Sequence, residues 1–186
     1  LITLIAVTVF FSFKGPILIE GGRSGFRIKR WNGFERLLHW LTAASFVALS
    51  ITGLSMLFGR FVLIPVMGAK GFAAWADLAI GLHNNIGPWF GGFVVVMIVL
   101  WIRHNIPTAA DFAWLKSGGG IIGNAHPDAG FANGGEKVWF WFICTVGLVV
   151  IASGLVMNFP NWGFSRDEMQ LANLVHGTCS IAWVAL

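Results

Sequence analysis

The segment LLHWLTAASFVALSITGLSMLFG, residues 37–59, decides the fold because it has the length and composition of a membrane-crossing helix. About 20 consecutive apolar residues are enough for an α-helix to span the hydrocarbon core of a bilayer. Residues 78–102 and 138–157 also meet this requirement, and a fourth apolar run begins near Met169 and continues to Leu186. The pattern predicts an all-α protein, a transmembrane four-helix bundle in which the fourth helix is truncated.

The composition favours a membrane protein over a soluble or nucleic-acid-binding one. Hydrophobic residues make up 56% of the chain and charged residues only 11%, whereas about 25% of the residues in soluble domains are charged. The formal net charge is +4, but six of the 12 basic residues lie between Lys14 and Arg36, directly before the first apolar run. That position is typical of the cytoplasmic flank of a membrane helix. We therefore expect a lipid bilayer as a partner, and no nucleic acid.

The positions of the Lys and Arg residues also predict how the chain is oriented. Nine of the 12 lie in the flank before the first run or in the loop between the second and third runs. The excess of positive charge on cytoplasmic segments places both on that side of the membrane. We divide the chain into residues 1–13, the apolar remnant of an N-terminal helix or signal segment, residues 14–36, a basic cytoplasmic linker, and residues 37–186, the membrane domain.

The histidines are the main candidates for a functional site. Of the five, His104 and His126 lie in the loop between the second and third runs, whereas His39, His83 and His176 lie inside apolar runs. An ionisable side chain inside a membrane is costly and usually functional. One such histidine alone would be explained equally well by a hydrogen bond between helices. Three of them, with no acidic partner in the helices, indicate haem ligands.

The expected depth of each histidine predicts how they pair. The second and fourth helices both run inward, and His83 and His176 each lie near the outer end of its helix, so they can be the two axial ligands of one haem. His39 lies near the cytoplasmic end of the first helix. At 1.5 Å per residue, the fourth helix reaches that depth about 14 residues beyond His176, just past Leu186. The geometry predicts two stacked haems, one near each face.

Small residues in these helices fit a flat macrocycle, although they fit plain helix packing equally well. The glycines concerned are Gly53, Gly81, Gly87, Gly91, Gly92, Gly154 and Gly177.

Five short stretches, in order, carry a resemblance to a known family. They are ERLLHW at 35–40, GLH at 81–83, RHNIP at 103–107, NGGEK at 133–137 and LVHG at 174–177. They are distributed over most of the chain from Arg30 onward. In these stretches the chain resembles the cytochrome b (gamma) subunit of membrane-bound respiratory formate dehydrogenase.

The resemblance implies a multi-pass protein of the bacterial inner membrane that binds two haem b groups. Its axial iron ligands would include His39, His83 and His176, and residues 37–186 would be the cytochrome b domain. Electrons would arrive from an iron–sulfur (beta) subunit at the outer face. They would leave to a quinone, menaquinone or ubiquinone, near the cytoplasmic face, where Asn133 and Gly135 match the family's quinone contacts. Formate oxidation would occur on a separate molybdenum or tungsten (alpha) subunit, so no catalytic residue is expected here.

Three alternatives remain open at this point. The chain could instead be the cytochrome b anchor of a hydrogenase or of another molybdoenzyme or quinone oxidoreductase, because these share the same helices and histidines. A transporter or channel would need more polar residues in the middle of the helices. A membrane anchor without haem would leave the three membrane histidines unexplained. For Asn133 and Gly135, a turn before the third helix is as good an interpretation as a quinone contact.

Overall fold

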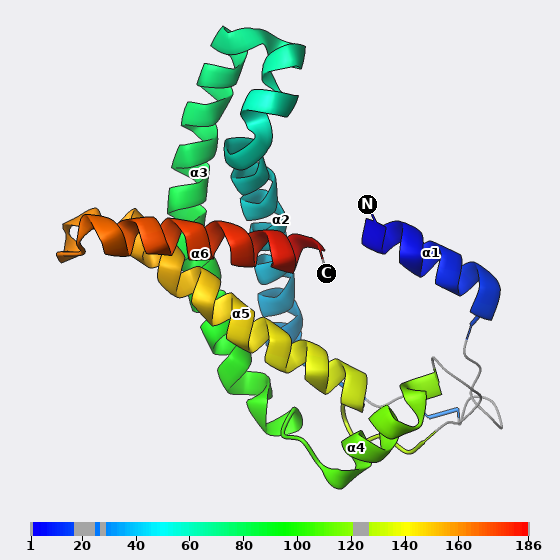
Figure 1. Ribbon diagram of the computed structural model, residues 1–186. Helices are drawn as coiled ribbons and strands as arrows, with labels where there is room; N and C mark the ends of the chain where they lie inside the picture. The colour runs from blue at the N-terminus through cyan, green and yellow to red at the C-terminus, as the bar shows by residue number, and fades with distance from the viewer. Residues whose placement is uncertain (1, 17–24, 27–28, 121–126, 186) are drawn as a thin grey trace.

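The computed structural model describes residues 2–16, 25–26, 29–120 and 127–185, and this part of the chain is helical with no strand. Arg23, Arg27, His126 and Leu186, which entered the sequence-based predictions, lie outside the described residues. The α-helices in Figure 1 are α1 (Ile2–Lys14), α2 (Gly33–Val62), α3 (Ile64–Trp101), α4 (Ala109–Lys116), α5 (Gly134–Asn158) and α6 (Arg166–Ala185). Short 3-10 turns are η1 (Ile102–His104), η2 (Gly118–Gly120) and η3 (Pro160–Trp162).

The two helices that begin on the side of the basic segments start with the same capping motif. The side chain of Asn32 accepts a hydrogen bond from the backbone N–H of Glu35 at 2.9 Å, and the Glu35 carboxylate accepts from the N–H of Asn32 at 2.7 Å. Asn133 and Glu136 make the same reciprocal pair at the start of α5. Each pair satisfies two N–H groups that would otherwise lack partners at a helix end. The sequence N-G-x-E therefore fixes where α2 and α5 begin.

The all-helical prediction is confirmed, and the described part contains more helices than the four expected. The apolar runs fall in α2, α3, α5 and α6, and among the described residues α2, α3 and α5 are long and apolar enough to cross a membrane. The additional helices are α1 and α4, and α4 lies within the loop between the second and third apolar runs. α3 also begins earlier than the run at 78–102, although Gly68, with φ of 73°, interrupts its first turns.

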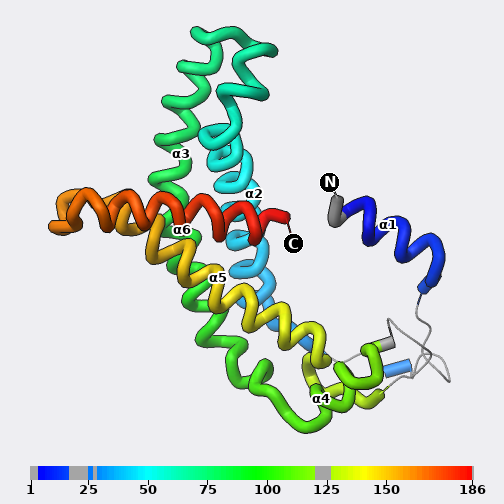
Figure 2. The backbone as a smooth tube through the Cα atoms, viewed as in Figure 1, coloured from blue at the N-terminus to red at the C-terminus, as the bar shows by residue number. Residues whose placement is uncertain are grey.

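The helices form two hairpins that cross each other. In Figures 1 and 2, α2 and α3 lie side by side and antiparallel, and α5 and α6 make a second hairpin against them, while α1 lies to one side. The buried core between the hairpins contains Phe90 and Val94 of α3, Val150 of α5 and Trp183 of α6.

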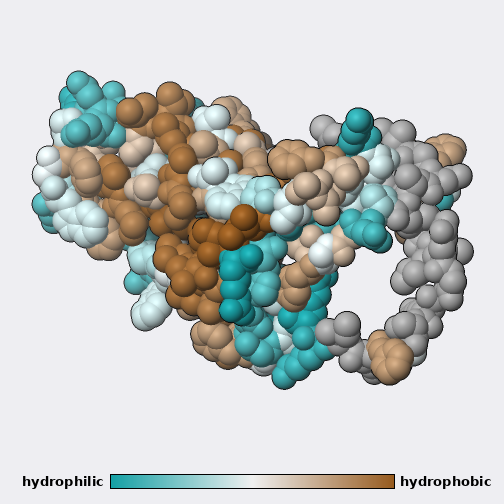
Figure 3. Space-filling view, turned by 90° about the horizontal axis from the view of Figure 1, so that it is seen from below, coloured by the Kyte–Doolittle hydropathy of each residue, from teal (hydrophilic) through white to brown (hydrophobic). Residues whose placement is uncertain are grey.

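The outer faces of the helices are apolar as well as the inner ones. The side chains of Trp40 and Val99, for example, are 69% and 68% exposed. Figure 3 shows apolar side chains over much of the surface seen from below. Contiguous apolar surface on this scale is rare on a soluble monomer and fits helices whose outer faces contact lipid.

Candidate functional site

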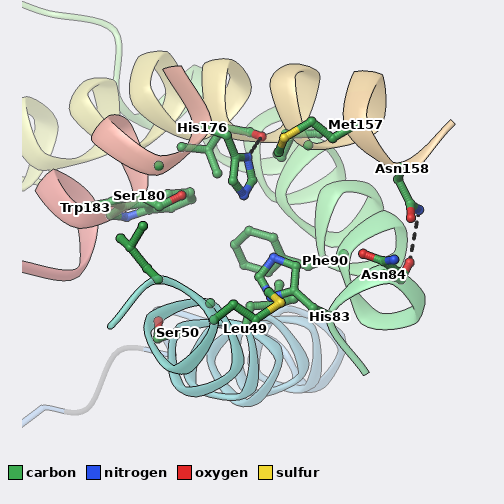
Figure 4. A pocket seen from close by; sticks show the side chains of 18 of the residues that line it. Leu49, Ser50, His83, Asn84, Phe90, Met157, Asn158, His176, Ser180 and Trp183 are labelled. Carbon is green, nitrogen blue, oxygen red and sulfur yellow. Dashed lines mark hydrogen bonds between the residues drawn. The ribbon is translucent and has the colours of Figure 1, made fainter. Parts of the chain in front are cut away.

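A cavity of about 530 Å³ lies where the two hairpins cross. Helices α2, α3, α5 and α6 all contribute to its wall, which is mostly apolar and includes Phe46, Phe90 and Trp183. His83 enters from α3 and His176 from α6. In Figure 4 their rings point toward one another across the cavity. The structure thus brings together the two histidines whose matching depth had paired them.

The spacing of the two rings is that of two ligands of one iron. Their centroids are 6.1 Å apart and their planes make an angle of 78°. With metal–imidazole bonds of about 2.0 Å, rings on opposite sides of one metal ion have centroids roughly 6 Å apart. The gap between His83 and His176 is therefore wide enough for one metal ion between the two rings.

Hydrogen bonds on the far side of each ring fix which nitrogen faces the cavity. His176 Nδ1 lies 2.9 Å from the carbonyl oxygen of Val150. A carbonyl can only accept, so Nδ1 must carry the proton and donate it. Nε2 is then the unprotonated nitrogen, which is the form that binds a metal. Orientation of a ligand histidine by a carbonyl behind it is usual in metal sites.

His83 is oriented in the same way by a hydroxyl group. Its Nδ1 lies 2.9 Å from Thr52 Oγ1, and that hydroxyl also lies 2.8 Å from the carbonyl oxygen of Ala48. A hydroxyl has one proton, and the Ala48 carbonyl can only accept, so the Thr52 hydroxyl donates there and accepts from His83 Nδ1. Nε2 of His83 is therefore also unprotonated. Two such lone pairs that face each other across an apolar cavity favour a cation between them.

Two glycines make the space for these rings. A Cβ atom at Gly53 would lie 3.2 Å from His83 Cε1, and one at Gly154 would lie 3.0 Å from His176 Cε1. Both contacts are closer than a carbon–carbon optimum of about 3.5–4.0 Å. A side chain at either position would push the imidazole off its position in the cavity.

This set of donors fits haem better than a bare metal ion. Among the described residues, no group of three or more His, Cys, Asp or Glu side chains is placed to hold a metal. Two neutral imidazoles on opposite sides complete the coordination of an iron only when a macrocycle supplies the other four ligands. The apolar and aromatic wall suits the faces of a porphyrin.

A second cavity, of about 550 Å³, lies nearer the amino-terminal end of α2 and contains His39 in its wall. Its wall also includes Trp101, whose indole Nε1 is buried without a hydrogen-bond partner. A buried donor of this kind is uncommon in native proteins, and a group bound in the cavity would explain it. His39 and Thr52 are 13 positions apart on α2, which corresponds to about 20 Å along the helix. The described residues place no second histidine in this cavity.

Three aromatic side chains separate the two cavities. Phe46, Phe90 and Trp183 contribute to the wall of both. Their ring centroids are 6.3 Å apart for Phe46 and Phe90, 5.3 Å for Phe46 and Trp183, and 5.7 Å for Phe90 and Trp183. The cavities are therefore neighbours that share a wall of aromatic side chains.

Asn133 and Gly135 have clear structural roles at the start of α5. Asn133 caps the helix, and its Oδ1 accepts the N–H of Glu136 at 2.9 Å. A Cβ atom at Gly135 would lie 2.9 Å from Trp114 of α4, so glycine allows α4 to pack there. Neither residue lines the second cavity, although Ala132 and Glu136 on either side of them do.

A buried ion pair holds α4 against α5 beside this segment. Lys137 Nζ lies 2.7 Å from Asp111 Oδ2 and donates at 3.0 Å to the carbonyl of Ile106, and both charged side chains are less than 10% exposed. The hydrogen bond from Lys137, together with those from Thr108, lowers the pKa of Asp111. The pair therefore fixes α4, and the loop that contains it, against the first turn of α5.

The sequence-based analysis missed the groups behind the histidines. Thr52 and Ser153 each precede a glycine in the middle of an apolar helix, in the pairs Thr52-Gly53 and Ser153-Gly154. That repeated hydroxyl–glycine pair was a usable signal. His104, in contrast, stacks on Phe131 at 4.3 Å and accepts from Arg103 Nε at 3.0 Å, and it lies in the wall of neither cavity.

The fold and this site agree with a family of membrane cytochromes. Residues 30–186 match the model of the family described as prokaryotic cytochrome b561. The match covers most of the chain, and the chain belongs to this family.

Individual proteins similar to this chain belong to a narrower class, the cytochrome subunits of formate dehydrogenases. The chain is 29% identical over 164 residues to the formate dehydrogenase cytochrome b556(fdo) subunit of Escherichia coli, covering 86% of this chain and 74% of that protein. It is 26% identical over 166 residues to the nitrate-inducible formate dehydrogenase cytochrome b556(Fdn) subunit of the same species, covering 83% and 71%. The formate dehydrogenase cytochrome b556 subunit of Haemophilus influenzae is 28% identical over 160 residues, covering 81% and 63%. The family resemblance noted in the sequence is therefore confirmed.

Proposed function

We propose that this chain is the di-haem cytochrome b subunit of a formate dehydrogenase complex in the bacterial inner membrane. It would carry electrons from an iron–sulfur subunit at the outer face to a quinone near the cytoplasmic face. The observation that carries the proposal is the pair His83 and His176, whose rings are 6.1 Å apart with Nδ1 of each engaged from behind.

His83 and His176 would hold the first haem b, which supplies a one-electron centre when it is bound. The protein's contribution is to present two unprotonated Nε2 atoms and to exclude water with an apolar wall. The Val150 carbonyl and the Thr52 hydroxyl hold the rings in that orientation. Gly53 and Gly154 leave the rings their space.

His39 would hold the second haem b in the neighbouring cavity. The unpartnered Nε1–H of Trp101 is suited to donate a hydrogen bond to an acceptor in this cavity, such as a carboxylate. The aromatic wall formed by Phe46, Phe90 and Trp183 would then lie between the two haem sites.

The quinone site is proposed at the cytoplasmic end, beside the start of α5. Because Oδ1 of Asn133 accepts the helix cap, its amide nitrogen is the group that would donate to a quinone carbonyl. The ion pair of Lys137 and Asp111 would hold α4 and its loop over this site. Electrons would move inward and protons would be taken up inside, against about 2.3 kcal/mol per charge for each 100 mV.

The partners follow from the relatives, which are cytochrome subunits of formate dehydrogenases. We propose an iron–sulfur (beta) subunit at the outer face and a molybdenum or tungsten (alpha) subunit that oxidises formate. In this arrangement the chain contains no residue that acts on formate.

The proposal is tested on the complete complex purified from membranes. We expect two haem b per copy of this chain, both reduced on addition of formate and reoxidised by a quinone. A complex in which formate reduces neither haem would refute the formate dehydrogenase assignment. A reduced-minus-oxidised spectrum without b-type bands would refute the cytochrome.

A further inference from the structure

A buried hydroxyl lies behind each histidine of the first cavity, but the two hydroxyls lie at different distances from the rings. Thr52 on α2 and Ser153 on α5 both precede a glycine, and both hydroxyls donate back to a carbonyl of their own helix, Ala48 at 2.8 Å and Val149 at 2.7 Å. Both residues are buried, with 3% and 6% of their surface exposed. The two hydroxyls are therefore matched in helix position, burial and internal bonding.

Their distances to the rings are not matched. Thr52 Oγ1 lies 2.9 Å from His83 Nδ1, which is a full hydrogen bond. Ser153 Oγ lies 3.4 Å from His176 Nδ1, and that nitrogen already donates to the Val150 carbonyl at 2.9 Å. His83 thus depends on a side-chain hydroxyl, whereas His176 depends on the backbone and gains little from Ser153.

We propose that the Thr52 hydroxyl is a positioning group that fixes the tautomer of His83 and lowers the reduction potential of the iron bound there. This inference rests on the proposed function, because it concerns the same site. An acceptor behind a ligand imidazole increases the electron density at its Nε2 and makes it a more basic ligand. A more basic ligand stabilises ferric iron more than ferrous iron, so removing the acceptor should raise the potential.

The deciding comparison uses two substitutions that each remove one hydroxyl. T52V keeps the shape of the side chain and removes the acceptor behind His83. S153A removes the matched hydroxyl behind His176, where the Val150 carbonyl remains. Both variants also lose the bond to their own helix, so any effect of helix bending or packing should appear in both.

The readouts are haem content and a potentiometric titration of each haem by its optical bands, in the intact complex. Second-shell substitutions typically weaken metal binding by about 10–100-fold. If a tenfold loss falls on the ferric state, the potential of that haem rises by about 59 mV in T52V. S153A should keep the potentials of the unmodified protein, and T52S, which restores a hydroxyl, should restore them as well.

Several results would overturn the proposal. If the potentials in T52V equal those of the unmodified protein, the Thr52 hydroxyl does not tune the iron bound at His83. An equal rise in S153A would show that helix packing is responsible. If T52V loses a haem, the proposal requires that T52S and S153A both retain it. An H83A variant that keeps both haems would instead refute the proposed function, because His83 would not be a ligand.

Discussion

Asn133 is proposed to have two roles, helix cap and quinone donor, and two substitutions can separate them. Replacement by alanine removes the 2.9 Å hydrogen bond that caps α5. Loss of such a cap costs about 1 kcal/mol, which corresponds to roughly a fivefold shift in a local equilibrium. Asn133→Ala alone therefore weakens α5 whether or not a quinone binds, and it cannot test the second role.

Asn133→Asp is the sharper substitution. Aspartate keeps the oxygen that accepts from the N–H of Glu136, and its charge is favourable at a helix N-terminus by about 0.3–1 kcal/mol. The nearby carboxylate of Glu136 opposes part of this gain, although Glu136 is itself paired with Arg30 at 3.0 Å. We expect the stability of this variant to stay within about 0.5 kcal/mol of the parent. What it lacks is the amide N–H₂ donor.

Steady-state quinone reduction with formate as donor measures the outcome. Loss of one hydrogen bond to the quinone is worth about 1.4 kcal/mol, so KM for quinone should rise roughly tenfold in Asn133→Asp. Haem content and reduction of both haems by formate should not change. If KM is unchanged in Asn133→Asp, Asn133 is only a cap, and the proposed quinone contact is wrong.

Three further predictions follow from other parts of the structure. Lys137 lowers the pKa of Asp111 below its ordinary value of 3.8, so the Asp111 carboxylate stays charged and paired at pH values above 3.8. The contact between α4 and α5 should persist there and be lost as the pH falls through the lowered pKa. Asp111→Asn should therefore admit pepsin to α4 over the whole acid range, and equal protection in both proteins would contradict this. Gly154→Leu should displace the ring of His176 and reduce haem content, while an unchanged spectrum would show that the glycine is not needed. With both native cysteines replaced, a cysteine in place of Lys29 should react with an impermeant label only from the cytoplasmic side. Labelling from the outer side would show that the chain has the opposite orientation in the membrane.

The helical architecture was predictable because apolar runs of this length have one stable solution in a membrane. The boundaries were less so. Polar first turns such as 33–36 are helical because Asn32 and Glu35 cap them, although they add nothing to the apolar run. α3 was expected to begin at Leu78, but residues 69–77, which include Lys70 and Asp77, are helical as well. Two charges about two turns apart interrupt an apolar pattern without interrupting a helix.

The pairing of His83 with His176 was predictable from depth, since helix rise converts position in sequence into height. The groups behind the rings were not, because they depend on how each helix is rotated about its axis. Thr52 and Val150 bond the histidines only because α2 and α5 turn those residues toward α3 and α6. The segment at Asn133 illustrates the opposite case. The sequence allowed a turn or a ligand contact, and the structure supplies a cap and a packing role.

The most direct test is whether His83 and His176 serve one iron. Haem stoichiometry and low-temperature optical spectra should be compared for H83A, H176A and the double variant in the intact complex. If the two residues bind the same iron, both single variants lose the same one of two haem b signals, and the double variant loses no more. If H83A and H176A lose different haems, or the double variant loses both, the two rings do not share an iron.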